Sequence, residues 1–189
     1  MKVIQLFKNE SQLIKRASKN NREAQQKLFE RHSPKMLSVC RQYVKDIHHA
    51  EEVMLNGFLK VFTHLSDFRN DGSFEGWVRR TMIREAISFL RKQQKIEFSE
   101  EIFADAVEFS DPVTSEFNVA HIQDMIDSLP QGYRMVFVMY AVDGYKHSEI
   151  AQMLKISEGT SKSQLFKARK MLQEKLEQEN IADYGTGKI

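Results

Sequence analysis

The chain has 189 residues, of which 28 are Lys or Arg and 26 are Asp or Glu, so its formal net charge is only +2. Apolar residues make up 41% and charged residues 29%, a mixture typical of folded globular chains and not of disordered ones. With 8 Gly and 3 Pro, a collagen-like, linker-like or turn-rich all-β chain is excluded. One domain or two small domains would fit this length.

Cys40 is the only cysteine, so the chain cannot form an internal disulfide, which favours a reducing compartment. The N-terminus holds a short apolar patch interrupted by Lys8, without the features of a secretion signal. Because no uncharged apolar run approaches the roughly 20 residues that span a bilayer, we expect a cytoplasmic protein with no membrane insertion.

Apolar residues at helical spacing predict helices along most of the N-terminal half. Ser11 is predicted to cap a first helix, and Asn20 or Asn21 a second. Ser33 followed by Pro34 has the pattern of a cap and the first position of a third helix, where proline loses no needed donor.

The longest apolar stripe of the chain comes next. Its spacing of i, i+3, i+4 and i+7 is typical of a helix that packs on a core, and its residues are Ala50, Val53, Met54, Gly57, Phe58, Val61, Phe62 and Leu65. A loop at residues 66–72 then leads to a further helix that Ser73 can cap. Between residues 79 and 95, Glu85 is the single acid, and the basic residues are Arg79, Arg80, Arg84, Arg91, Lys92 and Lys95.

Residues 96–133 contain no Lys or Arg. Their acids are Glu97, Glu100, Glu101, Asp105, Glu108, Asp111, Glu116, Asp124 and Asp127. Because the first part of this stretch also lacks apolar periodicity, we predict a flexible acidic linker at residues 97–116. It would join a domain at residues 1–96 to a second at residues 117–178, followed by a tail at 179–189.

Helical spacing resumes at Ile122 and stops before Pro130. Residues 135–142 are an apolar run whose composition would also suit a strand, and we predict helix because no partner strand is apparent. The sequence therefore predicts an all-α fold with two small helical domains.

Residues 149–177 have the pattern of two helices joined by a tight turn, in which Ile156 fills the core and Ser157 caps the second helix. A helix-turn-helix has this arrangement, and so does a plain pair of helices with a solvated basic face. The inward face is predicted to hold Ser161, Leu165, Ala168 and Leu172, and the outward face Lys162, Ser163, Phe166, Lys167, Arg169 and Lys170.

The order of basic, acidic and basic segments is consistent with two cationic surfaces that contact one polyanion, or with ordinary solvated helices and a solvated loop.

The sequence does not indicate enzyme chemistry. His48 and His49 are adjacent and point to different helix faces, the other histidines lack ligand spacing, and Cys40 has no nearby base. We therefore expect no catalytic residues, no metal site and no cofactor.

Several motifs in the C-terminal part lie in a recognisable order. They are Leu129-Pro130, Tyr133-Arg134, Val136-Phe137, Gly144, Glu149-Ile150-Ala151, Ile156-Ser157 and Gly159-Thr160. With them, residues 129–172 resemble the promoter-reading domain of bacterial sigma factors of the extracytoplasmic-function (ECF) group of the sigma-70 family. The N-terminal half is similar to that family's polymerase-binding and promoter-melting helices at residues 50–53, 58–62 and 72–80.

The resemblance implies that the second helix of the helix-turn-helix reads the minus-thirty-five promoter element. The matching positions are Glu158, Lys162, Ser163, Gln164, Phe166, Lys167, Arg169 and Lys170. Gln164 stands where the family usually has Arg, and Ser161 where it usually has a core Val, so the promoter sequence stays open.

Capture of an unpaired base at the minus-ten element requires aromatic platforms and cations. The resemblance assigns this role to Trp77, Arg79, Arg80, Arg84, Ser88 and Arg91, with Arg84 at a position that is often Asn in the family. Trp77 could equally be a core residue, because Phe74 and Val78 lie at helical spacing from it.

Docking on core RNA polymerase is implied for Glu51, Glu52, Leu55, Asn56 and Lys60. An exposed Leu55 would suit an apolar docking patch, although it could also face the core. The other implied partners are promoter DNA and an anti-sigma factor, and the acidic linker could imitate nucleic acid on the polymerase or act as a tether.

Three function classes follow: an alternative-type sigma factor, a stand-alone helix-turn-helix transcriptional regulator, and an interaction module that does not bind DNA. The first predicts weak DNA binding by the free protein and strong binding with core polymerase. The second predicts tight binding alone, at a two-fold symmetric site. The third predicts no specific binding.

Overall fold

The computed structural model describes residues 2–69, 71–93 and 119–185, which divide into two compact units, Met1–Gln93 and Gln94–Ile189. Every regular element in these ranges is helical, which confirms the predicted all-α fold. The predicted acidic linker at 97–116 lies outside the described residues. In the described part of the chain, no helix is long and apolar enough to cross a membrane.

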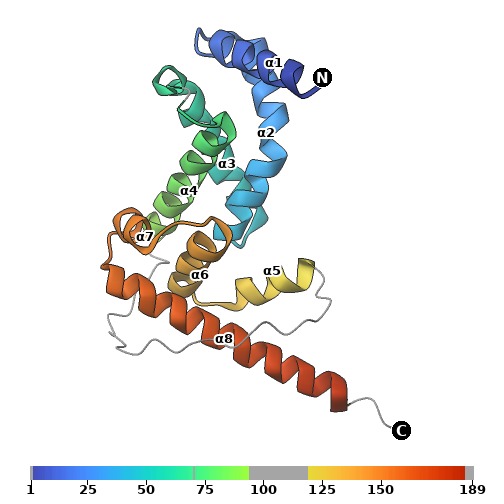
Figure 1. Cartoon of the computed structure of the whole chain (residues 1–189), viewed down its shortest axis with the longest axis vertical. Helices are drawn as coiled ribbons and strands as arrows, with labels where there is room; N and C mark the ends of the chain where they lie inside the picture. The colour runs from blue at the N-terminus through green and yellow to red at the C-terminus, as the bar shows by residue number, and fades with distance from the viewer. Residues whose placement is uncertain (1, 70, 94–118, 186–189) are drawn as a thin grey trace. The chain divides into compact units, whose positions relative to one another are not determined.

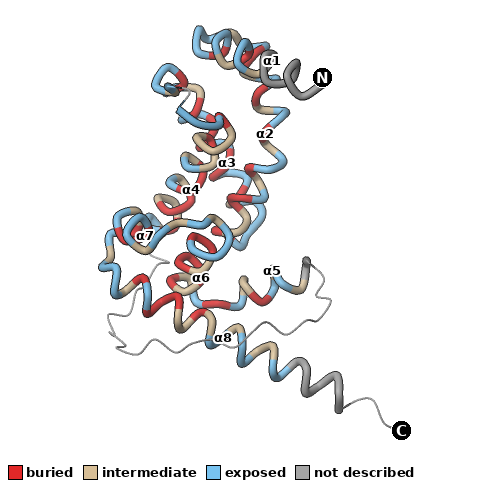
Figure 2. The backbone as a smooth tube through the Cα atoms, viewed as in Figure 1, coloured by how far each residue is buried: buried red, intermediate tan, exposed pale blue. Residues whose placement is uncertain are grey.

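The N-terminal unit is built on three helices that pack on one another, α2, α3 and α4 (Figure 1). A further helix, α1, lies against α2, and a short 3₁₀ turn at Leu65–Asp67 follows α3. The helix bounds are Lys2–Ala17 for α1, Arg22–Tyr43 for α2, Ile47–Thr63 for α3 and Phe74–Lys92 for α4. Figure 2 shows buried and exposed residues alternating along these helices, as amphipathic helices require.

Two predicted caps in this unit are confirmed. The Asn21 side chain accepts a hydrogen bond from the Ala24 N–H at 2.9 Å, at the start of α2. Ser73 Oγ accepts one from the Gly76 N–H at 3.0 Å, at the start of α4. Each satisfies one of the donors that a helix N-terminus leaves unpaired.

Two other predicted helix starts are wrong. Ser11 lies inside α1, which already begins at Lys2, and Pro34 lies inside α2. Pro34 is exposed, so water can reach the carbonyl that the missing proline N–H leaves unbonded. Burial of His32 before Pro34 and Met36 after it keeps α2 continuous.

The α3–α4 contact is close at Gly57. A Cβ atom added there would lie 2.3 Å from Met82 Sδ, so glycine lets the two helices approach. Cys40 is fully buried in the same unit, and burial, with the Glu85 charge as a smaller cause, raises the pKa of its thiol to about 12. The reactive thiolate of Cys40 therefore does not form at neutral pH.

The C-terminal unit holds α5, α6, a π-helical turn, α7 and α8. Their bounds are Val119–Ser128, Gln131–Phe137, Val138–Val142, His147–Leu154 and Glu158–Gly185. The first half of α8 packs against α6 and α7 (Figure 1). The run at 135–142 is helical, as predicted, whereas α8 continues to Gly185, beyond its predicted end near Glu177.

The turn between α7 and α8 has the geometry of a helix-turn-helix. Lys155 adopts a left-handed conformation with φ of 53°, and the Ile156 N–H bonds back to the Ala151 carbonyl at 3.1 Å. Ser157 Oγ accepts the Thr160 N–H at 2.9 Å and caps α8 as predicted. Ile156 is half-buried rather than enclosed in the core.

A buried ion pair joins α5 to α6. Arg134 is fully buried, its Nη1 donates to Asp127 Oδ1 at 2.9 Å, and its Nη2 donates to Gln131 Oε1 at 3.1 Å. Because a buried guanidinium is costly without partners, these contacts are required for the packing of α6.

We predict that Asp127→Ala lowers the free energy of unfolding by about 3–5 kcal/mol, since it leaves the buried Arg134 charge without its carboxylate. Urea denaturation of the full chain, followed by near-ultraviolet circular dichroism, measures this. Lys170→Ala is the matched control: its 3.9 Å ion pair with Glu174 is exposed, so its loss costs less than about 1 kcal/mol. Equal losses in the two variants would contradict the role assigned to Arg134.

Candidate nucleic-acid interface

One face of α4 is a basic stripe. Arg80, Arg84 and Arg91 are exposed, and Ser88 between them is half-buried. These positions are three or four residues apart, so their side chains share one side of the helix. The opposite side is buried and holds Phe74, Val78, Met82, Ile83, Ala86, Ile87 and Leu90. The basic stripe, defined here as Arg80, Arg84, Ser88 and Arg91, is therefore the solvent face of a core helix.

Arg79 lies outside the basic stripe. It precedes Arg80 by one residue, which turns its Cβ about 100° around the helix axis, and it is half-buried. Of the six residues predicted for the minus-ten element, four form the basic stripe and Trp77 lies one helical turn before Arg80. Only Arg79 lies on the flank.

Trp77 is held in an aromatic cluster and remains partly exposed. Its ring centroid lies 5.5 Å from that of Phe68 and 6.1 Å from that of Phe74. Phe74 is buried, whereas Trp77 and Phe68 are half-buried. Trp77 therefore holds Phe68 of the segment before α4 against that helix and keeps part of its own side chain exposed.

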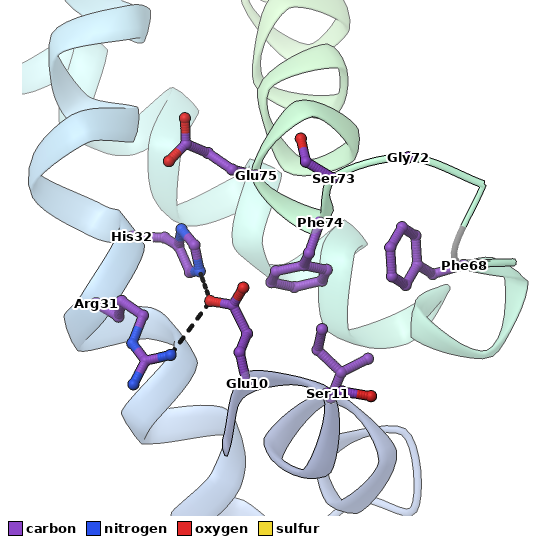
Figure 3. Close-up of a pocket in the computed structure, with 10 residues that line it drawn as sticks. Glu10, Ser11, Arg31, His32, Phe68, Gly72, Ser73, Phe74 and Glu75 are labelled. Atoms are coloured by element: carbon purple, nitrogen blue, oxygen red, sulfur yellow. Dashed lines mark hydrogen bonds and ion pairs between the residues drawn. The ribbon is translucent and has the colours of Figure 1, made fainter. Parts of the chain in front are cut away.

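A cavity of about 530 Å³ opens next to this cluster (Figure 3). It is lined by Glu10, Ser11, Ile14, Arg31, His32, Phe68, Gly72, Ser73, Phe74 and Glu75. Figure 3 shows residues of α1 and α2 on one side and the loop before α4 on the other. Gly72 has a φ of 124°, which other residues rarely adopt, and so fixes the course of that loop.

Glu10 ties the α1 side of the cavity to α2. Glu10 Oε1 lies 3.0 Å from His32 Nε2 and 3.3 Å from Arg31 Nη1. The sequence prediction missed these residues because Glu10 and His32 are 22 positions apart, and no local pattern relates them. The cavity is large enough for a nucleobase and combines aromatic rings with hydrogen-bonding groups, which are the two means by which proteins hold an unstacked base.

The solvent face of α8 carries a second basic surface. Glu158, Lys162 and Lys170 are exposed, and Phe166, Lys167 and Arg169 are half-buried. Positions 158, 162, 166 and 170 follow at intervals of four, so they share one side of the helix.

Two residues predicted for this surface are instead buried. Ser163 is 5% exposed and Gln164 is 0% exposed. Gln164 shares the inward side of α8 with Ser161 and Ala168, because residues three or four positions apart face the same way. Ser163 Oγ donates to the Thr160 carbonyl at 3.0 Å. The prediction that Ser163 lies on the outward face of α8 is therefore wrong, and the side chain of Gln164, which was expected at a DNA-binding position, is also buried.

A third surface lies on α3. Leu55 is 54% exposed and Leu59 is 67% exposed, so Leu55 does not face the core. Glu51, Glu52 and Asn56 are also exposed, on the same side of the helix. The α3 surface is defined here as Glu51, Glu52, Leu55, Asn56 and Leu59. Leu59 escaped the sequence prediction, although its spacing of four from Leu55 would have indicated it.

Lys60 differs from the rest of the predicted docking set. It is exposed, but its Nζ forms an ion pair with Glu85 of α4, whose side chain is 12% exposed. Lys60 therefore compensates Glu85, the acid in the middle of α4, and is held toward that helix.

Each of the two helical units thus presents an exposed basic face, and in the second unit this face belongs to a helix-turn-helix. Residues 28–96 match the family described as Sigma-70 region 2, and residues 121–172 match Sigma-70, region 4. The chain belongs to the sigma-70 family, in its ECF group.

Relatives over nearly the whole chain agree. The chain is 25% identical over 176 residues to the ECF RNA polymerase sigma factor SigW of Bacillus subtilis, covering 86% of this chain and 94% of that protein. It is 26% identical over 180 residues to the ECF RNA polymerase sigma-E factor of Escherichia coli, covering 87% and 93%. RNA polymerase sigma factor SigV of Bacillus subtilis is 24% identical over 152 residues, covering 80% and 90%.

Solved structures show the same fold. The sigma factor RpoE in complex with the anti-sigma factor NepR from Bartonella quintana matches with a TM-score of 0.54 and 18% identity, covering 80% of this chain and 96% of that one. CnrH in complex with the cytosolic domain of CnrY matches with a TM-score of 0.50 and 20% identity, covering 87% and 95%.

Proposed function

We propose that this protein is an alternative-type sigma factor that binds core RNA polymerase, directs it to promoters and helps to open the duplex. The observation that supports this most strongly is the pair of exposed basic faces, one on α4 within the region 2 match and one on α8 within the region 4 match. Sigma factors are transcription initiation factors, so the polymerase carries out the catalysis and this chain supplies binding and specificity.

The basic stripe on α4 is the proposed minus-ten surface. Its guanidinium groups neutralise the backbone of the separated strand, and the exposed part of Trp77 provides a stacking platform. A base extracted from the stack costs a few kcal/mol, which its binding site must offset. We place that base in the cavity beside Phe68 and Phe74.

The basic face of α8 is the proposed minus-thirty-five surface. Lys162 and Phe166 lie where they can contact base edges, because Lys donates to guanine acceptors and an aromatic ring packs on the thymine methyl. Lys167, Arg169 and Lys170 are proposed to bind phosphates, which fix the register of the helix on DNA. Glu158 at the first position of α8 can accept from a cytosine amino group.

The α3 surface is the proposed docking site for core polymerase, since it combines exposed leucines with acids.

We also propose an anti-sigma partner, because RpoE of Bartonella quintana binds one. The segment 97–116 is proposed to link the two domains, and the cytoplasm is the proposed location, where polymerase and promoter DNA are found.

Dependence on the polymerase tests the proposed function. Promoter fragments are first selected from a random library by in vitro transcription. Their affinity is then measured for the free chain and for the chain with core polymerase. A sigma factor binds weakly alone and tightly with core. Equal affinity in both states, at a two-fold symmetric site, would instead identify a stand-alone regulator.

We predict that Arg84→Ala lowers open-complex formation about tenfold, because one charged contact to the melted strand is lost. Potassium permanganate reactivity of unpaired thymines measures the opening. Lys27→Ala on α2 removes an exposed charge elsewhere in the same unit and leaves opening unchanged. A template with a pre-opened bubble should recover part of the Arg84→Ala loss. If Arg84→Ala opens the promoter as well as Lys27→Ala does, the basic stripe does not contact the melted strand.

We predict that Leu55→Asp and Leu59→Asp each weaken binding to core polymerase about tenfold, since each replaces buried apolar contact area in the complex by a charge. Fluorescence anisotropy with labelled chain measures the Kd. Ile122→Asp is the control, because Ile122 is also an exposed apolar residue, on α5 of the other unit. If Ile122→Asp weakens binding as much as the leucine variants, the docking surface is not on α3.

A further inference from the structure

The inward face of α8 contains one hydroxyl that bonds to another helix. Ser161 is fully buried, and its Oγ lies 2.8 Å from Nδ1 of His147, the first residue of α7. A buried hydroxyl requires such a partner. The first turns of the two helices in the helix-turn-helix are therefore joined by a side-chain hydrogen bond.

The same histidine supports an aromatic stack. The Tyr140 ring lies on the His147 imidazole with centroids 4.7 Å apart and an interplanar angle of 22°. Tyr140 comes from the π-helical turn, where the Asp143 N–H bonds to the Val138 carbonyl at 3.0 Å across five residues. Val138 is buried in that turn, whereas Tyr140 is 36% exposed and so reaches the surface.

Arg169 of α8 completes the stack. Its guanidinium carbon lies 5.6 Å from the centre of the Tyr140 ring, within the range of a cation–π contact. The series Ser161, His147, Tyr140 and Arg169 thus begins and ends on α8 and passes through α7 and the π-helical turn. It spans the segment of α8 that carries Lys162 and Phe166, the residues placed at base edges.

We propose that Tyr140 and His147 are positioning residues for the upstream DNA contact: they hold the Arg169 guanidinium in one place before DNA arrives, so that it binds a backbone phosphate beside the recognition face of α8. The inference rests on the proposed function, because it assigns a role within the minus-thirty-five surface. If the Arg169 side chain is already ordered in the free protein, less conformational entropy is lost when it binds DNA.

The charge of the histidine is compatible with this role. Burial and then the Lys162 charge lower the pKa of His147, with a smaller contribution from Arg169, while Glu158 opposes them. The imidazole is therefore neutral at pH 7 and does not repel the guanidinium.

The test is a double-mutant cycle on the assembled holoenzyme, read as equilibrium binding to a promoter fragment at several salt concentrations. Tyr140→Ala removes the ring and is expected to weaken binding about fivefold. Tyr140→Phe retains the ring and should bind as the unmodified protein does. Val142→Ala is the control for an exposed apolar side chain of the same turn, and it should leave binding unchanged.

The decisive variant is Tyr140→Ala combined with Arg169→Ala. Because Tyr140 acts through Arg169, the double variant should bind no more weakly than Arg169→Ala alone. Both single variants should also reduce the slope of log K against log salt, by up to about 0.9 for one phosphate contact. If the two losses multiply, or if Tyr140→Phe loses as much as Tyr140→Ala, Tyr140 is only structural and the proposal is overturned.

Two changes at His147 separate the stack from the hydrogen bond. His147→Phe retains a ring under Tyr140, and His147→Asn retains a group that can bond to Ser161. The proposal expects His147→Phe to bind DNA better than His147→Asn, and the reverse order contradicts it. If the unmodified chain forms no holoenzyme, the proposed function fails; if the holoenzyme transcribes normally but the cycle is additive, only the positioning role fails.

Discussion

Each helix that carries a proposed DNA surface is also a core helix of its own unit, and this constraint decides which residues can reach DNA. The buried side of α4 includes Val78 and Ile87, and that of α8 includes Leu165 and Ala168. Since successive residues turn about 100° around the axis, only one stripe of each helix remains for a ligand. This periodicity excludes Gln164 from the DNA surface and leaves Arg79 on the flank of α4.

The same constraint explains how a chain with a net charge of only +2 can bind a polyanion. Cations are concentrated on the two solvent stripes, and the two acids of α4 are paired with lysines of neighbouring helices, Glu75 with Lys35 and Glu85 with Lys60. Two contacts of moderate affinity give tight binding when both units belong to one chain and bind the same DNA molecule. This requires that the distance between the two units matches the distance between the two DNA elements. A larger partner that holds both units would supply that separation, which agrees with the exposed leucines of α3.

Much of this architecture could be predicted from sequence, because it depends on local patterns. Caps at Asn21 and Ser73 and the turn before α8 were predicted from residue type alone. The Ser11 and Pro34 predictions failed because α1 and α2 begin before these signals, which usually start a helix. In α2, burial of His32 and Met36 on either side of Pro34 favours one continuous helix.

The contacts that shape the sites join different helical elements, and the apolar pattern of each element does not show which side chains of another element it meets. Glu10 with His32 closes the cavity, and Tyr140 with His147 supports Arg169. Such pairs depend on how helices pack, and for Tyr140 on a π-helical turn that apolar periodicity does not reveal.

The central claim is that both basic faces bind one promoter at the same time while the chain is bound to polymerase. In vitro transcription with core polymerase, from a promoter with about five base pairs inserted between its two elements, tests this directly, because half a helical turn moves one element to the opposite side of the duplex. The account predicts that transcription is lost and that it returns when both elements are restored to their original spacing. Transcription that is unaffected by the insertion would contradict it.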